Sequence, residues 1–159
     1  NKKLKLYLNP KLVDATYYHQ LPTYLIILWL ATIVEILLGT HMREGIEMLV
    51  KSFPGKSDIF LMDTLGAFKY IHTALGIILV SMTAIIWNKV MMNSQPHWVA
   101  IVLTRILVGI FIFQIVMGEL MVFGNFSPSF RLLHMWGASI SISIIMGLYM
   151  IINRSQIND

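Results

Sequence analysis

The chain has 159 residues, of which 57% are hydrophobic and only 13% are charged. Soluble domains carry about 25% charged residues, so this composition excludes an ordinary soluble domain and favours a membrane protein. The formal net charge of +4 comes largely from lysines in the first 11 residues. We interpret them as topology signals and lipid contacts, and we expect no nucleic-acid partner. There are no cysteines, which excludes disulfides, iron–sulfur clusters and thiolate metal sites.

Four apolar runs follow one another along the chain, approximately at residues 21–39, 65–87, 98–123 and 132–152. Each is long enough to cross the roughly 30 Å hydrocarbon layer, which takes about 20 residues of helix. The sequence therefore predicts an all-α membrane protein, with residues 21–152 forming a four-transmembrane-helix bundle in the lipid bilayer. A basic segment, residues 1–20, precedes the bundle, and a tail, residues 153–159, follows it. The N-terminus lacks the pattern of a signal peptide, so we expect none.

The segment between the first two runs, residues 40–64, is predicted to be an outer loop. Residues 42–50 have helical spacing, which predicts a short helix on the outer surface, and "FPGKSD" predicts a turn after it. Lysine and arginine gather on the cytoplasmic side of membrane proteins. They are concentrated in residues 1–20, with Lys89 and Arg154 on the same predicted side, whereas acidic residues balance those of the outer loop. We therefore expect both termini in the cytoplasm.

The chain contains an internal repeat. "IVEILLGTHMREG" (33–45) aligns without gaps on "IFQIVMGELMVFG" (112–124), matching Gly39 with Gly118. The second and fourth runs align through their opening motifs, "FKYIH" (68–72) and "FRLLH" (130–134). The order of helix, loop and histidine-bearing helix then occurs twice. This pattern predicts a bundle built from two repeated helical hairpins.

The two motif histidines, His72 and His134, are the strongest candidates for a site. Their helices are expected to run in the same direction, with each histidine five to eight residues in. At 1.5 Å per residue both lie roughly 7–12 Å below the helix start, in the outer leaflet. An intramembrane histidine indicates function by default, and two facing histidines ligate the iron of a b-type haem. The alternative is that each imidazole only hydrogen-bonds a neighbouring helix.

Residues beside the histidines fit this hypothesis. Gly76 and Gly137 lie about one turn away and leave space for a porphyrin, or else allow close helix packing. Lys69 and Arg131 precede the histidines by three residues, one turn closer to water. They are candidates for pairing with haem propionates, and snorkelling at a helix end is the alternative.

Two acidic residues, Glu35 and Glu119, fall within the apolar runs close to the depth of the histidines. Each is a candidate for hydrogen bonding a ligand imidazole or for proton transfer. Structural pairing, for example with Arg43 or Lys69, is the alternative. The remaining histidines and nearby methionines are weaker candidates: His19 and His97 as solvated cytoplasmic residues, His41 as an interfacial residue, and Met117, Met121 and Met135 as apolar filler rather than axial ligands.

The motifs together resemble the haem A synthase family. "VEILLGTHMREGIE" resembles the first-helix exit of a family half, and "LGAFKYIHTALGIIL" resembles its second helix with a haem ligand. "FQIVMGELMVFGNFSPSFRLLH" is similar to the third helix, outer loop and second ligand, so the resemblance covers about residues 22–152. Family members have two four-helix halves; one oxidises the methyl group of haem O to the formyl group of haem A, and the other holds haem b. The resemblance implies that this chain is one half, with His72 and His134 as axial ligands.

The departures from the family pattern point to the haem b half. The catalytic half carries a glutamate shortly before its first ligand and an arginine directly after it, where this chain has Lys69 and Thr73. The cysteine pair of that half is also missing. The resemblance implies a bacterial-type inner membrane and a role in electron transfer for haem oxidation. That reaction needs a second half, from further sequence, a homodimer or a partner chain.

Two alternatives remain at this point. The first is a diverged haem-carrying or structural subunit of a respiratory complex without synthase activity. The second is a helical membrane scaffold without haem.

Overall fold

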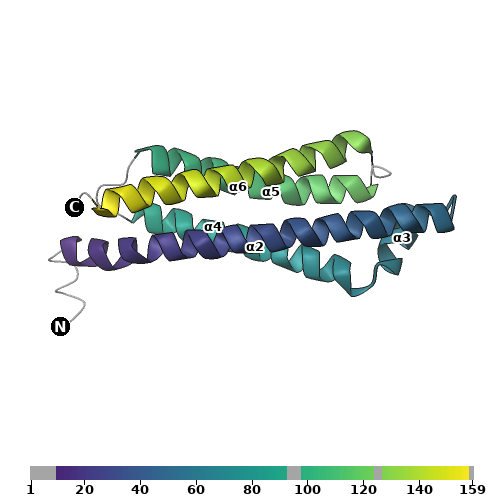
Figure 1. The fold of residues 1–159 in the computed structure, drawn as a ribbon, viewed down its shortest axis with the longest axis horizontal. Coiled ribbons are helices and arrows are strands. Elements are labelled where there is room, and N and C mark those ends of the chain that lie inside the picture. The colour runs from purple at the N-terminus through teal and green to yellow at the C-terminus, as the bar shows by residue number, and fades with distance from the viewer. Residues whose placement is uncertain (1–9, 93–97, 124–126, 158–159) are drawn as a thin grey trace.

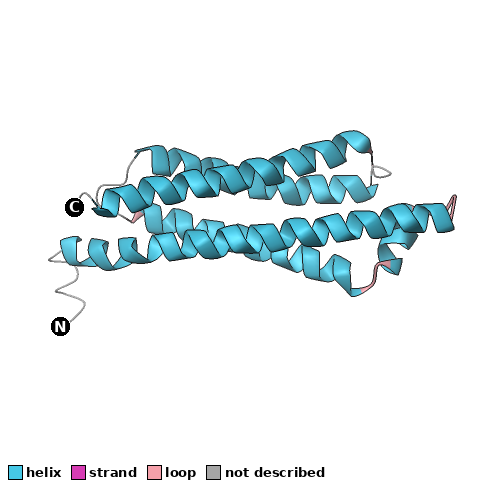
Figure 2. Cartoon of the chain, viewed as in Figure 1, coloured by secondary structure: helices cyan, strands magenta, loops and turns pink. Residues whose placement is uncertain are grey.

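The computed structural model describes residues 10–92, 98–123 and 127–157, and the side chains of residues 20–57, 59–92, 98–123 and 127–153. Within these ranges the chain is all-α and has no strand (Figures 1 and 2). The helices are α2 (Pro10–Ser52), α3 (Asp58–Thr64), α4 (Ala67–Met91), α5 (Trp98–Phe123) and α6 (Pro128–Ile157). Four of them contain segments long and apolar enough to cross a membrane: Gln20–Ser52, Ala67–Met91, Trp98–Phe123 and Pro128–Asn153. The predicted all-α membrane class and its four spans are confirmed.

The four long helices form a bundle in which each contacts two neighbours. α2 packs against α4 and α6, and α5 packs against the same two helices. The two histidine-bearing helices, α4 and α6, therefore occupy opposite corners of the bundle. The start of α2 and the end of α6 lie at one end, and α3 lies at the other, which we call the α3 end (Figure 1). α4 and α6 both begin at the α3 end, as the repeat predicted.

A seam of buried side chains fills the half of the bundle away from the α3 end. Its members recur at intervals of three and four residues, the spacing that keeps side chains on one helix face. Most are aliphatic, and the buried hydroxyls of Thr32, Thr83, Thr104 and Ser141 donate to carbonyls four residues earlier at 2.6–2.9 Å. The seam consists of Leu21, Leu25, Leu28 and Thr32 on α2; Leu79, Thr83, Ile86 and Val90 on α4; Ala100, Thr104, Leu107 and Phe111 on α5; and Ser141, Ile145, Leu148 and Ile152 on α6.

The predicted separate helix over residues 42–50 is wrong in one respect. These residues are helical, but they continue α2 without a break to Ser52. The Thr40 hydroxyl donates to the Ile36 carbonyl at 2.9 Å, and no proline occurs between Pro22, inside the helix, and Pro54, which follows it. At 1.5 Å per residue the 43 residues of α2 extend about 65 Å, well beyond the hydrocarbon layer.

The predicted turn after this segment is present. Lys56 N–H donates to the Phe53 carbonyl at 3.3 Å, and Gly55 has a positive φ of 84°, which glycine adopts without strain. The turn leads into α3, a helix within the predicted outer loop that the sequence pattern did not predict. The Ser57 hydroxyl caps α3 by accepting from the Phe60 N–H at 3.3 Å.

Candidate functional site

Towards the α3 end the seam changes from aliphatic to polar. Continuing its spacing places Glu35 on α2, His72 on α4, Gln114 on α5 and His134 on α6. Each of these four side chains is half-buried, and we call them the polar layer. Every long helix thus contributes one hydrogen-bonding side chain, and this side chain lies on the same helix face as the buried seam residues. Because polar groups are costly inside a membrane, four of them on the seam indicate a site rather than a packing solution.

Each helix also has a glycine on the seam within one turn of its polar residue: Gly39, Gly76, Gly118 and Gly137. Three of them make room for the polar layer. A Cβ atom at Gly39 would lie 3.2 Å from His72 Cε1, and one at Gly76 would lie 3.3 Å from Glu35 Oε1. One at Gly137 would lie 1.8 Å from Gln114 Nε2, which is a direct collision. The space beside Gly76 and Gly137, predicted to admit a porphyrin or to allow close helix packing, holds the side chains of Glu35 and Gln114.

Glu35 approaches His72 as the sequence analysis expected. The Oε1 atom of Glu35 lies 3.1 Å from Nδ1 of His72, and the two side chains are 16% and 22% exposed. The contact is close without being aligned as a hydrogen bond, and both His72 Nδ1 and Glu35 Oε2 are buried with no hydrogen-bond partner. The carboxylate is thus placed to orient the imidazole through Nδ1. The alternative pairing of Glu35 with Arg43 or Lys69 is not observed, because those residues contact other acids.

The second acidic candidate is not at the site. Glu119 is exposed, because the seam of α5 runs through Phe111, Gln114 and Gly118 and leaves residue 119 on another face. The α5 side chain that reaches α6 is Gln114, which extends toward Gly137. The sequence analysis missed Gln114 as a site residue. The signal was available, since the repeat alignment of 33–45 on 112–124 matches Glu35 with Gln114.

The two histidines occupy equivalent positions in the repeat, but their contacts differ. His72 lies against the Glu35 carboxylate of the preceding long helix, whereas the side chain of Gln114, the repeat equivalent of Glu35, extends toward Gly137 on α6. His134 Nδ1 and Gln114 Nε2, like His72 Nδ1 and Glu35 Oε2, are buried without a hydrogen-bond partner. Each such group costs about 1–3 kcal/mol unless a water or ligand satisfies it.

The chemistry of the polar layer is that of two imidazoles rather than a three-ligand metal centre. Among the described residues, no group of three or more His, Asp or Glu side chains is placed to hold a metal ion. Two imidazoles from opposite corners suit a planar group that brings its own equatorial ligands. A haem is such a group, because its porphyrin supplies four nitrogens and leaves two axial positions to the protein.

The basic candidates at the α3 end have acidic partners. Lys69 forms an ion pair with Asp63 and lies over the ring of Tyr70, 4.8 Å from its centroid. Arg131 Nη1 lies 3.8 Å from Glu47 Oε1. Each of the two basic residues predicted to pair with haem propionates, Lys69 and Arg131, therefore lies near an acidic side chain.

The remaining candidates lie outside the polar layer. His41 is exposed and its ring packs against Phe68, with centroids 4.9 Å apart. Met117 is buried on α5, and the sulfur of Met135 faces Arg43. The side chain of His19, and His97 as a whole, lie outside the described residues.

No known family model, curated protein or solved structure matches this chain. The resemblance to haem A synthases therefore depends on its sequence motifs. The polar layer stands independently of that resemblance, because it follows from the contacts of Glu35, His72, Gln114 and His134.

Proposed function

We propose that this chain is a haem A synthase-like membrane protein that binds one b-type haem through His72 and His134. The observation that carries the proposal is the polar layer, in which two imidazoles from opposite corners of the bundle lie on the buried seam together with Glu35 and Gln114. Buried atoms without partners at all four positions support it, because a helical membrane protein gains nothing from burying them unsatisfied.

The residues present fit the group. A haem, when bound, supplies a one-electron couple between ferric and ferrous iron. His72 and His134 would hold it as axial ligands. Glu35 faces Nδ1 of His72, which leaves the Nε2 atom of that ring for the iron. Gln114 fills the space beside Gly137, which lies one turn after His134 on α6.

The difference between Glu35 and Gln114 makes the two ligands inequivalent. A carboxylate near the His72 Nδ1 atom would increase the electron density of that imidazole, whereas His134 Nδ1 has no hydrogen-bond partner. The protein's electrostatic contribution to the iron is therefore larger from the α2 side. This arrangement suits a haem that transfers electrons at a defined potential.

In this proposal the work of the chain is electron transfer in support of the oxidation of haem O to haem A. The catalytic haem would be held by a second half, supplied by further sequence, a second copy or a partner chain. The haem would lie in the outer leaflet of a bacterial-type inner membrane, with both termini in the cytoplasm. The charge distribution along the sequence supports this orientation.

A second candidate is a haem-carrying or structural subunit of a respiratory complex, without synthase activity. It is favoured by the residues that replace the family's catalytic ones: Lys69 is paired with Asp63, and Thr73 is exposed. At these two positions the chain therefore lacks the glutamate and the arginine that flank the first ligand in the catalytic half of the family. Co-purification separates the candidates, because a second haem-binding half supports the synthase and oxidase or quinol-handling subunits support the alternative.

The decisive experiment is a pyridine haemochrome assay with oxidised and reduced spectra of the protein purified in mild detergent. The expected result is one b-type haem per chain with a low-spin, six-coordinate spectrum. A reproducibly colourless preparation from haem-replete cells would overturn the haem proposal and leave the helical scaffold as the function.

A further inference from the structure

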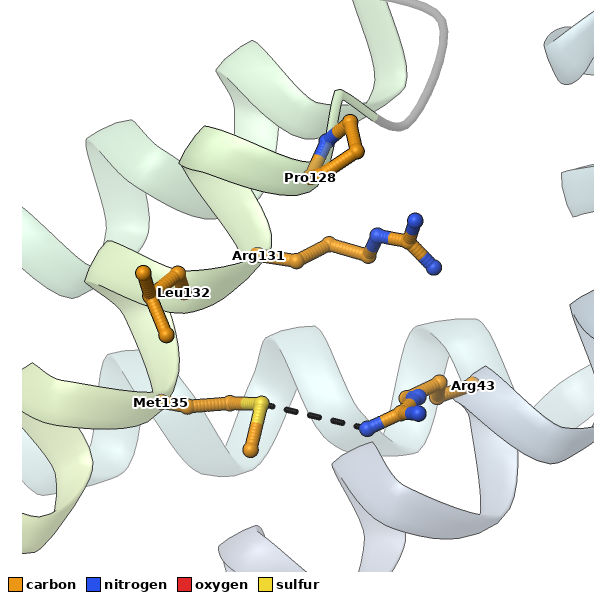
Figure 3. A pocket seen from close by; sticks show the side chains of 5 residues that line it. All are labelled: Arg43, Pro128, Arg131, Leu132 and Met135. Atoms are coloured by element: carbon orange, nitrogen blue, oxygen red, sulfur yellow. Dashed lines mark hydrogen bonds between the residues drawn. The ribbon is translucent and has the colours of Figure 1, made fainter.

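A hollow of about 210 Å³ lies on the outside of the bundle at the α3 end (Figure 3). It is shallow and open, and it lies where α2 and α6 pack together. Its lining combines two arginines with three apolar residues: Arg43, Pro128, Arg131, Leu132 and Met135. The polar layer does not contribute to this lining, so the hollow is a separate feature.

The two arginines share a single acid. Arg43 Nε lies 2.9 Å from Glu47 Oε1, and Arg131 Nη1 lies 3.8 Å from the same oxygen. Two guanidinium groups and one carboxylate leave this cluster with one excess positive charge. Lys51, one turn beyond Glu47, adds to the positive field at that carboxylate.

Both arginines also have donors that no strong acceptor satisfies. Arg43 Nη1 reaches only the thioether sulfur of Met135, at 3.9 Å, which is a weak acceptor (Figure 3). Arg131 Nε is buried and has no hydrogen-bond partner. An anion with oxygen acceptors placed in the hollow would accept from the guanidinium groups, whose side chains are 52% and 37% exposed, and would neutralise the excess charge.

The position of the hollow identifies the kind of anion. Arg131 is three residues after the start of α6, about 5 Å along its axis, at the end of a membrane-spanning segment. This is the level at which lipid headgroups meet the hydrocarbon. Leu132 and Met135, which are 47% and 50% exposed, continue the hollow with apolar surface.

We propose that this hollow binds the phosphate of an anionic phospholipid, with Arg43 and Arg131 holding the phosphate oxygens. The start of one acyl chain lies along Leu132 and Met135. A phosphodiester with one net negative charge matches the one excess positive charge of the cluster. A zwitterionic lipid fits less well, because it would bring its ammonium group beside two arginines. The proposal does not depend on haem binding.

The test is native mass spectrometry of the whole protein released from detergent micelles during titration with phosphatidylglycerol or phosphatidylcholine. Wild-type protein should retain one phosphatidylglycerol molecule more tightly than phosphatidylcholine. The R43Q/R131Q double variant should lose about tenfold or more in phosphatidylglycerol affinity, since each arginine near an anionic lipid contributes about fivefold. The matched control is Arg105→Gln, an exposed arginine on α5 outside the hollow, which should bind like wild type.

A second pair of variants tests the apolar wall while keeping both arginines. Leu132→Trp fills the hollow and should weaken phosphatidylglycerol binding, whereas Leu133→Trp, at the adjacent exposed residue outside the lining, should not. This pair decides the question if the double arginine variant does not fold. Three outcomes would each overturn the proposal. The first is that wild type and R43Q/R131Q bind phosphatidylglycerol equally, and the second is that wild type binds the two lipids equally. The third is that Leu132→Trp and Leu133→Trp have equal effects on phosphatidylglycerol binding. Full displacement of the lipid by millimolar inorganic phosphate would also overturn it, because free phosphate would then be the ligand.

Discussion

The carboxylate of Glu35 lies 3.1 Å from Nδ1 of His72, whereas the equivalent residue in the second half of the repeat is the uncharged Gln114, whose side chain extends toward Gly137. The two halves of the repeat therefore place a charged and an uncharged side chain at equivalent positions of the polar layer. This difference allows the electrostatics of the polar layer to be tested by exchanging glutamate and glutamine, which have nearly the same shape.

Exchanging these residues should move the reduction potential of the haem in opposite directions. A negative charge near the iron stabilises the ferric state, so Glu35→Gln should raise the potential and Gln114→Glu should lower it. We expect shifts on the order of tens of millivolts, because one charge acts over several ångströms in a medium of intermediate dielectric constant. A spectroelectrochemical titration of each purified variant measures them. Unchanged potentials in both variants would contradict the placement of these residues beside the axial ligands.

If His72 and His134 hold a haem, replacing either of them should change the spin state of its iron. His72→Ala or His134→Ala leaves the iron five-coordinate at best, so the absorption spectrum should become high spin or the haem should be lost. His41→Ala is the matched control, because His41 is exposed and packs on Phe68 at the same end of the bundle. It should remain low spin. A spectrum indifferent to both substitutions but altered by changes at His41, Met117 or Met121 would show that the ligands were assigned wrongly.

The sequence predicted the four spans and the helix positions of His72 and His134 because both follow from simple lengths. Bilayer thickness fixes how long an apolar run must be, and the two repeated motifs fix how far each histidine lies from its helix start. Glu35 was predicted beside His72 from its similar depth. These features depend only on how deep a residue lies along the membrane normal, and that depth follows from counting residues along a helix.

The predictions that were wrong concern the direction in which a side chain points around its helix. Glu119 was a candidate site residue because it is acidic and lies within an apolar run. The seam of α5 passes through Phe111, Gln114 and Gly118, so Glu119 lies on another face of the helix. The continuation of α2 was missed for a related reason. Charged residues after Gly39 suggested an interfacial segment, although Met42 continues the seam spacing and is buried. Following the seam in register along each helix would have identified both.

Adding a methyl group at Gly137 should destabilise the bundle. Its Cβ would lie 1.8 Å from Gln114 Nε2, so Gly137→Ala should cost about 1–3 kcal/mol of unfolding free energy through overpacking. Combining it with Gln114→Ala should recover much of this loss, because the colliding side chain is then absent. Unfolding in mixed detergent followed by circular dichroism measures each value.

Gly109→Ala is the control, since no atom lies within 4 Å of its Cβ position, and it should be neutral or stabilising by up to about 1 kcal/mol. Equal losses for the two single variants would contradict the collision.

The orientation of the bundle is open to a direct chemical test, because the chain has no native cysteine. Lys56 lies in the exposed turn before α3, and Met92 follows α4 at the opposite end of the bundle. With cytoplasmic termini, Lys56→Cys should react with an impermeant maleimide in intact cells or spheroplasts. Met92→Cys should react only after lysis.

The charge bias that motivates this expectation comes mainly from residues 1–20. Exchanging the lysines of that segment for glutamines should therefore weaken the preference for cytoplasmic termini. The reverse labelling pattern would place the α3 end in the cytoplasm, and with it the polar layer in the cytoplasmic leaflet.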